Sequence, residues 1–233
     1  MSAAPSPLIL WDVDHTLVSI TGVSREIYAR AYEHVIGRPL VYLADMAGRT
    51  EEAIIRETLV LNDVDPGHSF DAFYTALGDA ARALEGQMRE SGRALPGARE
   101  TLAAFATTNS VQSVVTGNIK SIAVTKLEAF GLNSFVDFDI GGYGDDSSDR
   151  AVLVRLAIER AEAKYGYGFR PSHAVVIGDT PHDVKGALDN GALSVGVATG
   201  SSDVSELVAA GAHLVLPDLL DSSALHELVF NRR

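Results

Sequence analysis

Two aspartates, Asp12 and Asp14, stand one residue apart directly after the apolar run Leu8–Trp11. A short apolar run predicts a buried strand, and open α/β sheets hold their reactive groups at the carboxyl ends of such strands. Burying two like charges is costly unless a cation is shared between them or one carboxyl keeps its proton. The pair therefore indicates a nucleophile, an acid and a metal ligand. By itself the pattern is weak, because an acidic turn in which Asp14 or Thr16 caps a helix explains it equally well.

A second strand end carries groups that suit an anion. Thr116, Gly117 and Asn118 close the strand predicted over 111–116 and precede a helix. A hydroxyl and unpaired backbone N–H groups at the start of a helix can hold phosphate oxygens. The alternative is an ordinary helix cap with a glycine turn.

A third strand end adds two more acids, Asp179 and Asp183, after the apolar run 174–177. Together with the first pair they would place four carboxylates on one edge of a sheet. Such a cluster needs a hard cation, and Mg²⁺ is bound by carboxylate and carbonyl oxygens and water. The alternative places Asp183 as a helix cap and Asp179 in a turn.

A positive side chain should balance the oxygens of a transferred phosphoryl group. Arg150 opens a helix after the loop 141–149 and is the first candidate, since it can point across the edge of the sheet. Lys120, close to the loop of Thr116, is the competitor. Either residue can instead be a surface charge.

Composition excludes several classes of protein. The chain has 233 residues, a formal net charge of −12 and no cysteine. The negative charge argues against nucleic-acid and membrane-surface partners, and the missing cysteines exclude disulfides and thiolate sites. No apolar run has membrane-spanning length, and the start lacks the features of a signal peptide. We expect a cytoplasmic protein, whose oligomeric state the sequence leaves open.

The order of predicted elements indicates an α/β fold. From residue 94 onward, helices alternate with short apolar strands, which predicts a Rossmann-like parallel sheet with helices on both faces. We expect residues 1–17 and 94–233 to form this core domain. After the first, the predicted strands cover residues 111–116, 136–138, 174–177, 193–197 and 213–216.

Residues 18–93 have a different pattern, with helical periodicity and no clear strand. We expect helices capped by Ser24 and by Thr50 and a longer helix over 70–90. This block then forms an inserted α-helical cap domain above the ends of the strands.

In their order and spacing, these motifs resemble those of the haloacid dehalogenase superfamily, in the phosphoglycolate-phosphatase-like branch with a helical cap. The resemblance covers nearly the whole chain and rests on residues 12–16, 116–118 and 178–183. One departure concerns Arg150 and Ala151, because the branch usually has a Lys-Pro pair there. Arginine keeps the charge but changes the hydrogen-bond geometry.

The resemblance implies a Mg²⁺-dependent phosphatase that acts on a small phosphorylated metabolite. Asp12 would attack phosphorus and form an aspartyl-phosphate. Asp14, with a raised pKa, would protonate the leaving oxygen and then activate water. The implied metal site comprises Asp12, the Asp14 carbonyl and Asp179, with Asp183 orienting the shell, and the implied phosphoryl site comprises Thr116, Gly117, Asn118 and Arg150.

Substrate choice is expected to lie in the cap. Gly48-Arg49-Thr50 resembles the cap loop that enters the site in this branch, and Arg49 suits a substrate carboxylate or a second phosphate. A surface arginine is the equal alternative.

Other activities of the fold fit less well. Dehalogenases lack an acid at the position of Asp14, and phosphonoacetaldehyde hydrolases need a cap lysine, whereas residues 18–93 contain none. A phosphoacceptor receiver domain would be shorter and would lack the helical insert. Phosphoryl transfer like that of β-phosphoglucomutase, and a non-catalytic binding protein on the same fold, are the alternatives to hydrolysis.

Overall fold

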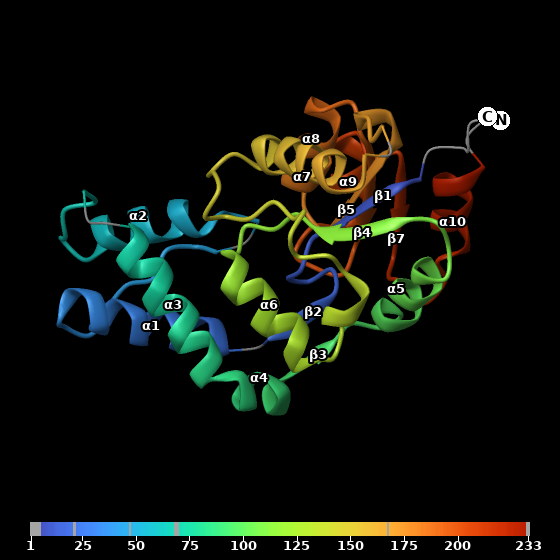
Figure 1. Ribbon diagram of the computed structural model, residues 1–233. Helices are drawn as coiled ribbons and strands as arrows, with labels where there is room; N and C mark the ends of the chain where they lie inside the picture. The colour runs from blue at the N-terminus through green and yellow to red at the C-terminus, as the bar shows by residue number, and fades with distance from the viewer. Residues whose placement is uncertain (1–5, 21, 47, 68–69, 167, 232–233) are drawn as a thin grey trace.

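The centre of the molecule is a parallel sheet of five strands in the order β4-β1-β5-β6-β7 (Figure 1). The computed structural model describes residues 6–231 apart from 21, 47, 68–69 and 167. None of the described helices is long and apolar enough to cross a membrane. The strands of the main sheet are β1 (Leu8–Trp11), β4 (Val111–Val114), β5 (Ala174–Gly178), β6 (Leu193–Val197) and β7 (Leu214–Leu216).

Strand β1 lies between β4 and β5, and all of its side chains are buried. Successive side chains of a strand point to opposite faces of the sheet. Accordingly, Leu8 and Leu10 belong to the apolar cluster on one face, and Ile9 and Trp11 belong to the cluster on the other. A strand that is apolar on both sides is therefore covered by helices on both sides.

Helices cover both faces of the sheet, which confirms the predicted α/β architecture. The face of Leu8 and Leu10 packs against α7 and α8, and the face of Ile9 and Trp11 packs against α5, α6 and α10. Helix α9 contacts β6 and β7. The helices are α5 (Ala98–Ala106), α6 (Lys120–Ala129), α7 (Arg150–Tyr165), α8 (Pro181–Asp189), α9 (Val204–Ala209) and α10 (Ser223–Phe230), with short 3₁₀ turns at Asn133–Phe135 and Pro171–His173.

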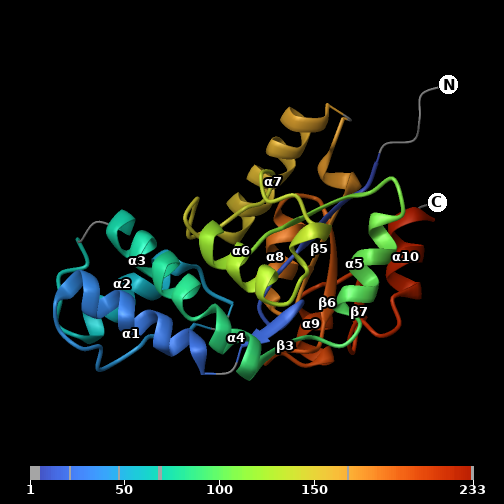
Figure 2. The ribbon, with the colours of Figure 1, turned by 60° about the horizontal axis from the view of Figure 1, so that its bottom comes forward.

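Four more helices form the cap, which lies to one side of the sheet in Figure 2. They have an apolar core of their own, which Ile119 and Ile122 from the start of α6 extend toward the sheet. Helix α1 packs along α3. The domain bounds at 18 and 93 remain a prediction. The cap helices are α1 (Val23–Ile36), α2 (Glu51–Leu61), α3 (Phe70–Ala83) and α4 (Glu85–Ser91).

The expectation that residues 18–93 contain no strand is wrong at both ends of this block. Strands β2 (Val18–Ile20) and β3 (Gly92–Ala94) pair in an antiparallel ribbon. The chain enters and leaves the cap through these strands. Pairing them satisfies the backbone groups of both connections, which short single runs of sequence do not reveal.

Two of the predicted cap helices also differ in detail. Helix α1 begins at Val23 after Gly22, which has φ 78°, so Ser24 is not its cap. The helix expected over 70–90 breaks at Leu84, whose φ of −101° and ψ of 7° are not helical. Leu84 and Met88 both lie in the cap core, where 4% and 0% of their surfaces are exposed.

The strand expected at 136–138 is absent. Asp137 donates its N–H to the carbonyl of Gln112 at 2.8 Å, as a sheet neighbour of β4 would. Its carboxylate, however, accepts the N–H of Asp139 at 3.0 Å and closes a turn. The chain next forms a β-bridge at Gly142, which pairs with Val115 directly after β4.

Candidate active site

The ends of β4, β1 and β5 lie side by side. In the sheet, Trp11 is level with Val114 on one side and with Ile177 on the other. The ladder continues one step further, because the N–H of Asp12 donates to the carbonyl of Ile177 at 2.8 Å. The side chains that follow these three strands therefore meet at one edge, as the sequence predicts.

Three acids from two of these strand ends converge. Asp12, Asp179 and Asp183 each offer a carboxylate oxygen within 4.8 Å of the others, and all three are buried. Asp183 also accepts the N–H of Thr180 at 3.2 Å and its hydroxyl at 2.7 Å, which fixes it in the first turn of α8. An all-oxygen set of this kind fits Mg²⁺.

The electrostatics of the three acids also fit a cation. Burial, reinforced by the charge of Asp183, raises the pKa of Asp12 well above its usual value. Burial and the same neighbour raise the pKa of Asp179 to about 7. Asp183 Oδ1 is buried and accepts no hydrogen bond from the described residues. Like charges so close together are stabilised by a positive ion among them.

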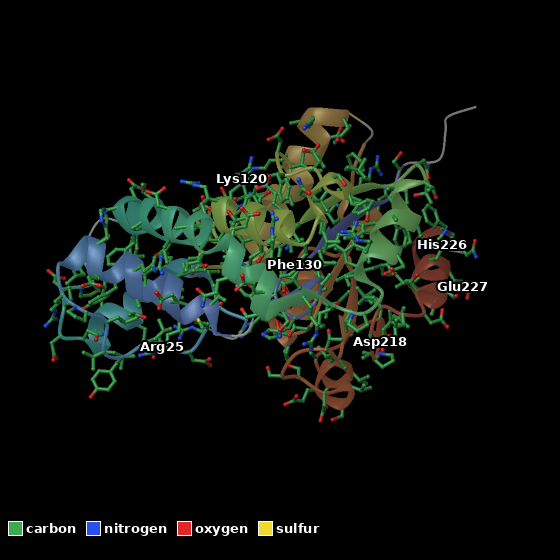
Figure 3. All side chains as sticks on the ribbon, turned by 90° about the horizontal axis from the view of Figure 1, so that it is seen from below. Arg25, Lys120, Phe130, Asp218, His226 and Glu227 are labelled. Carbon is green, nitrogen blue, oxygen red and sulfur yellow. The ribbon has the colours of Figure 1, made fainter. Side chains whose placement is uncertain are left out.

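Arg150 brings the nearest positive side chain to this cluster. Its Nη1 lies 3.4 Å from Asp12 Oδ1, and its Nε lies 3.3 Å from Asp183 Oδ1. Nη1 also donates to the carbonyl of Val115 at 3.1 Å. Lys120, the competing candidate, instead pairs with Asp139 at 3.2 Å and lies at the outer edge of the molecule in Figure 3.

The sequence analysis missed a second buried cation, Lys126 on α6. Its ammonium group donates to Asp14 Oδ1 at 2.7 Å, to Asp14 Oδ2 at 2.6 Å and to Asn118 Oδ1 at 2.8 Å. The signal for it was its place in α6, where Ala123 and Leu127 face the core, since an unpaired lysine is rarely buried in such a stripe.

The pKa of Asp14 contradicts the expectation that it is raised. Burial acts to raise it, but the charge of Lys126 and the hydrogen bonds from Lys126 and Asn118 outweigh burial, so the pKa lies below its usual value. The expectation failed because it counted the neighbouring carboxylates without this cation. The order of the two pKa values is therefore the reverse of the predicted one, because the pKa of Asp12 is raised and that of Asp14 is lowered.

The loop of Thr116, Gly117 and Asn118 is tied to the acid pair by the Asn118 side chain. Its amide nitrogen donates to Thr116 Oγ1 at 2.8 Å and to Asp14 Oδ2 at 2.7 Å. Thr116 and Asn118 are both buried. The amide thus holds the hydroxyl and the acid in fixed positions beside the start of α6.

A cavity of about 320 Å³ lies between this edge of the sheet and the cap. Its sheet end holds Asp12, Asp14 and the loop 116–118, so every core residue of the predicted site lines it or contacts a residue that does. Its cap end is lined by both apolar and polar side chains. The apolar lining comes from Ile20, Ile27, Met46, Ile54 and Ile122.

Glu51 and Tyr28, which belong to the polar cap residues of this cavity, were also missed. The hydroxyl of Tyr28 donates to Glu51 Oε2, and both side chains are buried. Burial raises the pKa of Glu51 to about 7, against the lowering effect of this hydrogen bond. The sequence shows Glu51 only as an acid suited to the first turn of a helix.

Arg49 lies beside the cavity, but its guanidinium pairs with Glu57 and donates to the carbonyls of Asp45 and Ala53. Its backbone makes the closer contact with the core. A Cβ atom on Gly117 would lie 2.0 Å from the carbonyl oxygen of Arg49. The N–H of Glu51 donates to the carbonyl of Gly117 at 2.9 Å, so the start of α2 rests on the loop 116–118.

An acid pair after the first strand, a hydroxyl loop after the second and further acids after the third define a hydrolase site on an α/β sheet. A family model for haloacid dehalogenase-like hydrolases matches residues 9–188. The chain belongs to this family, and the family assignment made from its motifs is confirmed. It is an enzyme, a hydrolase of the haloacid dehalogenase-like family.

Individual proteins agree with the family assignment. A phosphoglycolate phosphatase of Agrobacterium fabrum is 27% identical over 211 residues, which cover 88% of this chain and 86% of that protein. A hydrolase from Pseudomonas syringae has a similar structure, with a TM-score of 0.67 and 24% identity over 97% of this chain and 98% of that one. A predicted phosphatase from Clostridium acetobutylicum, 19% identical, has a TM-score of 0.67 over 98% of this chain and 100% of its own. These two structures show the shared fold.

We predict that Gly117→Ala lowers kcat/KM by at least about tenfold, because its methyl group displaces the Arg49 carbonyl and with it the start of α2. Steady-state kinetics on a generic phosphate ester measures this. Gly86→Ala is the matched control, since nothing lies within 4 Å of a Cβ there. Equal activity of the two variants would contradict the tight contact between loop and cap.

We predict that the metal-free protein becomes less stable as the pH rises from about 4 to 7. The unfolded pKa of an aspartate is about 3.9, and that of Asp179 in the folded protein is about 7. In this window the native state binds more protons, so the free energy of unfolding falls with rising pH.

Asp179→Asn should therefore raise the melting temperature of the metal-free protein at pH 8 by about 5 °C, and by less at pH 5. Thermal unfolding in a chelator measures both values. Mg²⁺ should raise the melting temperature of the wild type more than that of the variant. A variant that is less stable than the wild type at pH 8 would contradict the repulsion between these acids.

Proposed function

We propose that the protein is a Mg²⁺-dependent phosphatase that hydrolyses a small-molecule phosphate monoester through an aspartyl-phosphate. The observation that carries the proposal is the arrangement around one cavity of Asp12 beside two further acids, and of Asp14 held by Lys126 and Asn118. The first group suits attack on phosphorus beside a cation. The second suits proton transfer to and from oxygen.

In the first step, a carboxylate oxygen of Asp12 attacks phosphorus as the bond to the leaving oxygen breaks. The hydroxyl of Thr116, the N–H group of Gly117 and Arg150 hold the phosphoryl oxygens. The residues that would hold Mg²⁺ are Asp12 and Asp179, with Asp183 beside them; the ion would neutralise the negative charge that the phosphate brings to this acidic edge.

The leaving oxygen needs a proton, and Asp14 is the acid that supplies it. Asp14 gives up its carboxyl proton and becomes a carboxylate, which the ammonium group of Lys126 stabilises, as the lowered pKa of Asp14 indicates. In the second step, the ionised Asp14 accepts a proton from the water that attacks the aspartyl-phosphate. Lys126 then stabilises Asp14 in the form in which it acts as a base.

Similarity to the phosphoglycolate phosphatase of A. fabrum supports assignment to the phosphoglycolate-phosphatase-like branch. Hydrolysis is favoured over transfer to a second sugar, since the block 18–93 contains no lysine of the kind that β-phosphoglucomutase-like enzymes use in the cap. The net charge of −12 favours a small phosphorylated metabolite over nucleic acid or a membrane, and we retain the cytoplasm as the expected location.

We predict that the wild type releases inorganic phosphate from p-nitrophenyl phosphate with Mg²⁺ and loses this activity in a chelator. Asp12→Asn should reduce kcat by at least about a thousandfold, because the amide is a poor nucleophile. Colorimetric phosphate release measures both. A wild type inactive on a broad panel of phosphate esters, or an active Asp12→Asn variant, contradicts the proposal.

We predict that Lys126→Met lowers kcat by about a hundredfold or more, as expected for loss of a group that assists proton transfer. The variant should also move the acidic limb of the pH–rate profile upward, since the pKa of Asp14 rises without the cation. Lys120→Met is the matched control, removing a lysine that pairs at the surface. If the acidic limb of the pH–rate profile stays at the same pH in Lys126→Met, then Lys126 does not control the pKa of Asp14 during the reaction.

A further inference from the structure

We propose that Glu51, oriented by Tyr28, selects phosphate esters whose alcohol part carries a hydrogen-bond donor and no negative charge, and disfavours esters with a carboxylate there. This inference rests on the proposed phosphatase function and names its substrate class. An ammonium group and a hydroxyl group are the two sources of such a donor.

Glu51 is fixed at the cap end of the cavity. It is the first residue of α2, and its N–H donates to the carbonyl of Gly117 at 2.9 Å. Only 4% of its surface is exposed, and it lines the cavity together with Asp14 and Lys126. The alcohol part of a substrate whose phosphoryl group is held by the loop 116–118 therefore shares the cavity with this carboxylate.

Tyr28 determines what Glu51 can bind. Its hydroxyl donates a hydrogen bond to Glu51 Oε2, so the two side chains offer hydrogen-bond acceptors to the cavity. Tyr28 comes from α1 and Glu51 from α2, and both side chains are buried. A carboxylate held in this way pairs well with a donor and repels a second carboxylate.

The cations along the cavity are already paired with acids. Lys126 gives its three protons to the two oxygens of Asp14 and to Asn118. Arg49 pairs with Glu57, and Arg150 pairs with Asp12 and Asp183. A substrate carboxylate would thus compete with an acid of the chain for each of these cations.

The remaining basic side chain of the lining, His15, is exposed and follows Asp14 at the sheet end. It therefore lies beside the phosphoryl site. The cap end carries the apolar side chains of Ile27, Ile54 and Ile122 beside the polar residues Ser24 and Asp45, and the whole cavity has about 320 Å³. A cavity of this size suits a short alcohol with a polar group that reaches Glu51.

The test compares esters of similar size on the Mg²⁺-loaded enzyme. Phosphoethanolamine carries an ammonium group, glycerol 1-phosphate carries hydroxyls and 2-phosphoglycolate carries a carboxylate. We expect the wild type to give a higher kcat/KM with at least one of the first two than with the third. The higher of those two identifies the donor.

Glu51→Gln keeps the size of the side chain and removes its charge. We expect the ratio of kcat/KM for the preferred donor ester to that for 2-phosphoglycolate to fall at least about fivefold, the scale of a hydrogen bond to a charged group. Because both values come from one preparation, the ratio does not depend on the fraction of folded enzyme. If the variant yields no folded protein, Tyr28→Phe is judged by the same criterion.

Glu52→Gln is the matched control, because Glu52 pairs with Arg56 at the surface, next to Glu51 in the sequence, and loses the same charge. We expect its ratio to stay within twofold of the wild type. A wild type that prefers 2-phosphoglycolate, a fall of less than fivefold in Glu51→Gln, or an equal fall in Glu52→Gln overturns the inference while p-nitrophenyl phosphate is still hydrolysed. Failure to hydrolyse any ester overturns the proposed function as well.

Discussion

The structure depends on how negative charge is balanced at the carboxyl edge of the parallel sheet. Strand pairing brings Asp12 and Asp179 together, and α8 adds Asp183 from its first turn. Arg150 lies within 3.4 Å of Asp12 and 3.3 Å of Asp183, so a single guanidinium faces three buried acids. Burial, together with the remaining excess of negative charge, raises the pKa values of Asp12 and Asp179, and the excess makes the edge receptive to a divalent cation.

At Asp14, two residues after Asp12, the balance of charge shifts the pKa in the opposite direction. The carboxylate of Asp14 accepts hydrogen bonds from the ammonium group of Lys126, and the pKa of Asp14 is lowered. Neighbouring carboxylates of one chain are thus given different protonation behaviour by cations from two different helices, α6 and α7. Such a division between adjacent acids is what a reaction with a nucleophile and a proton carrier needs.

The sequence predicts the parts of this arrangement that local patterns determine. Apolar runs followed by Asp12, Thr116 and Asp179 locate the strand ends, and parallel pairing makes them neighbours. Lys126 could not be placed in this way, because it is separated from Asp14 by 112 positions and belongs to no motif. Its contact arises from the packing of α6.

The same limit explains the errors in the cap. Ribbon β2–β3 joins segments that are far apart in the sequence, and neither segment has a pattern long enough to indicate a strand on its own. The position of Glu51 over the loop 116–118 likewise follows from tertiary contact. Helical periodicity indicates that its helix exists but not what the first turn faces.

The contact between Gly117 and the start of α2 involves main-chain atoms on both sides. Its geometry is therefore indifferent to which side chains the cap carries at those positions. During divergence, the residues of the cap that face the ligand can change while the main-chain contact with Gly117 stays the same. The same catalytic core can therefore be combined with caps that recognise many different substrates.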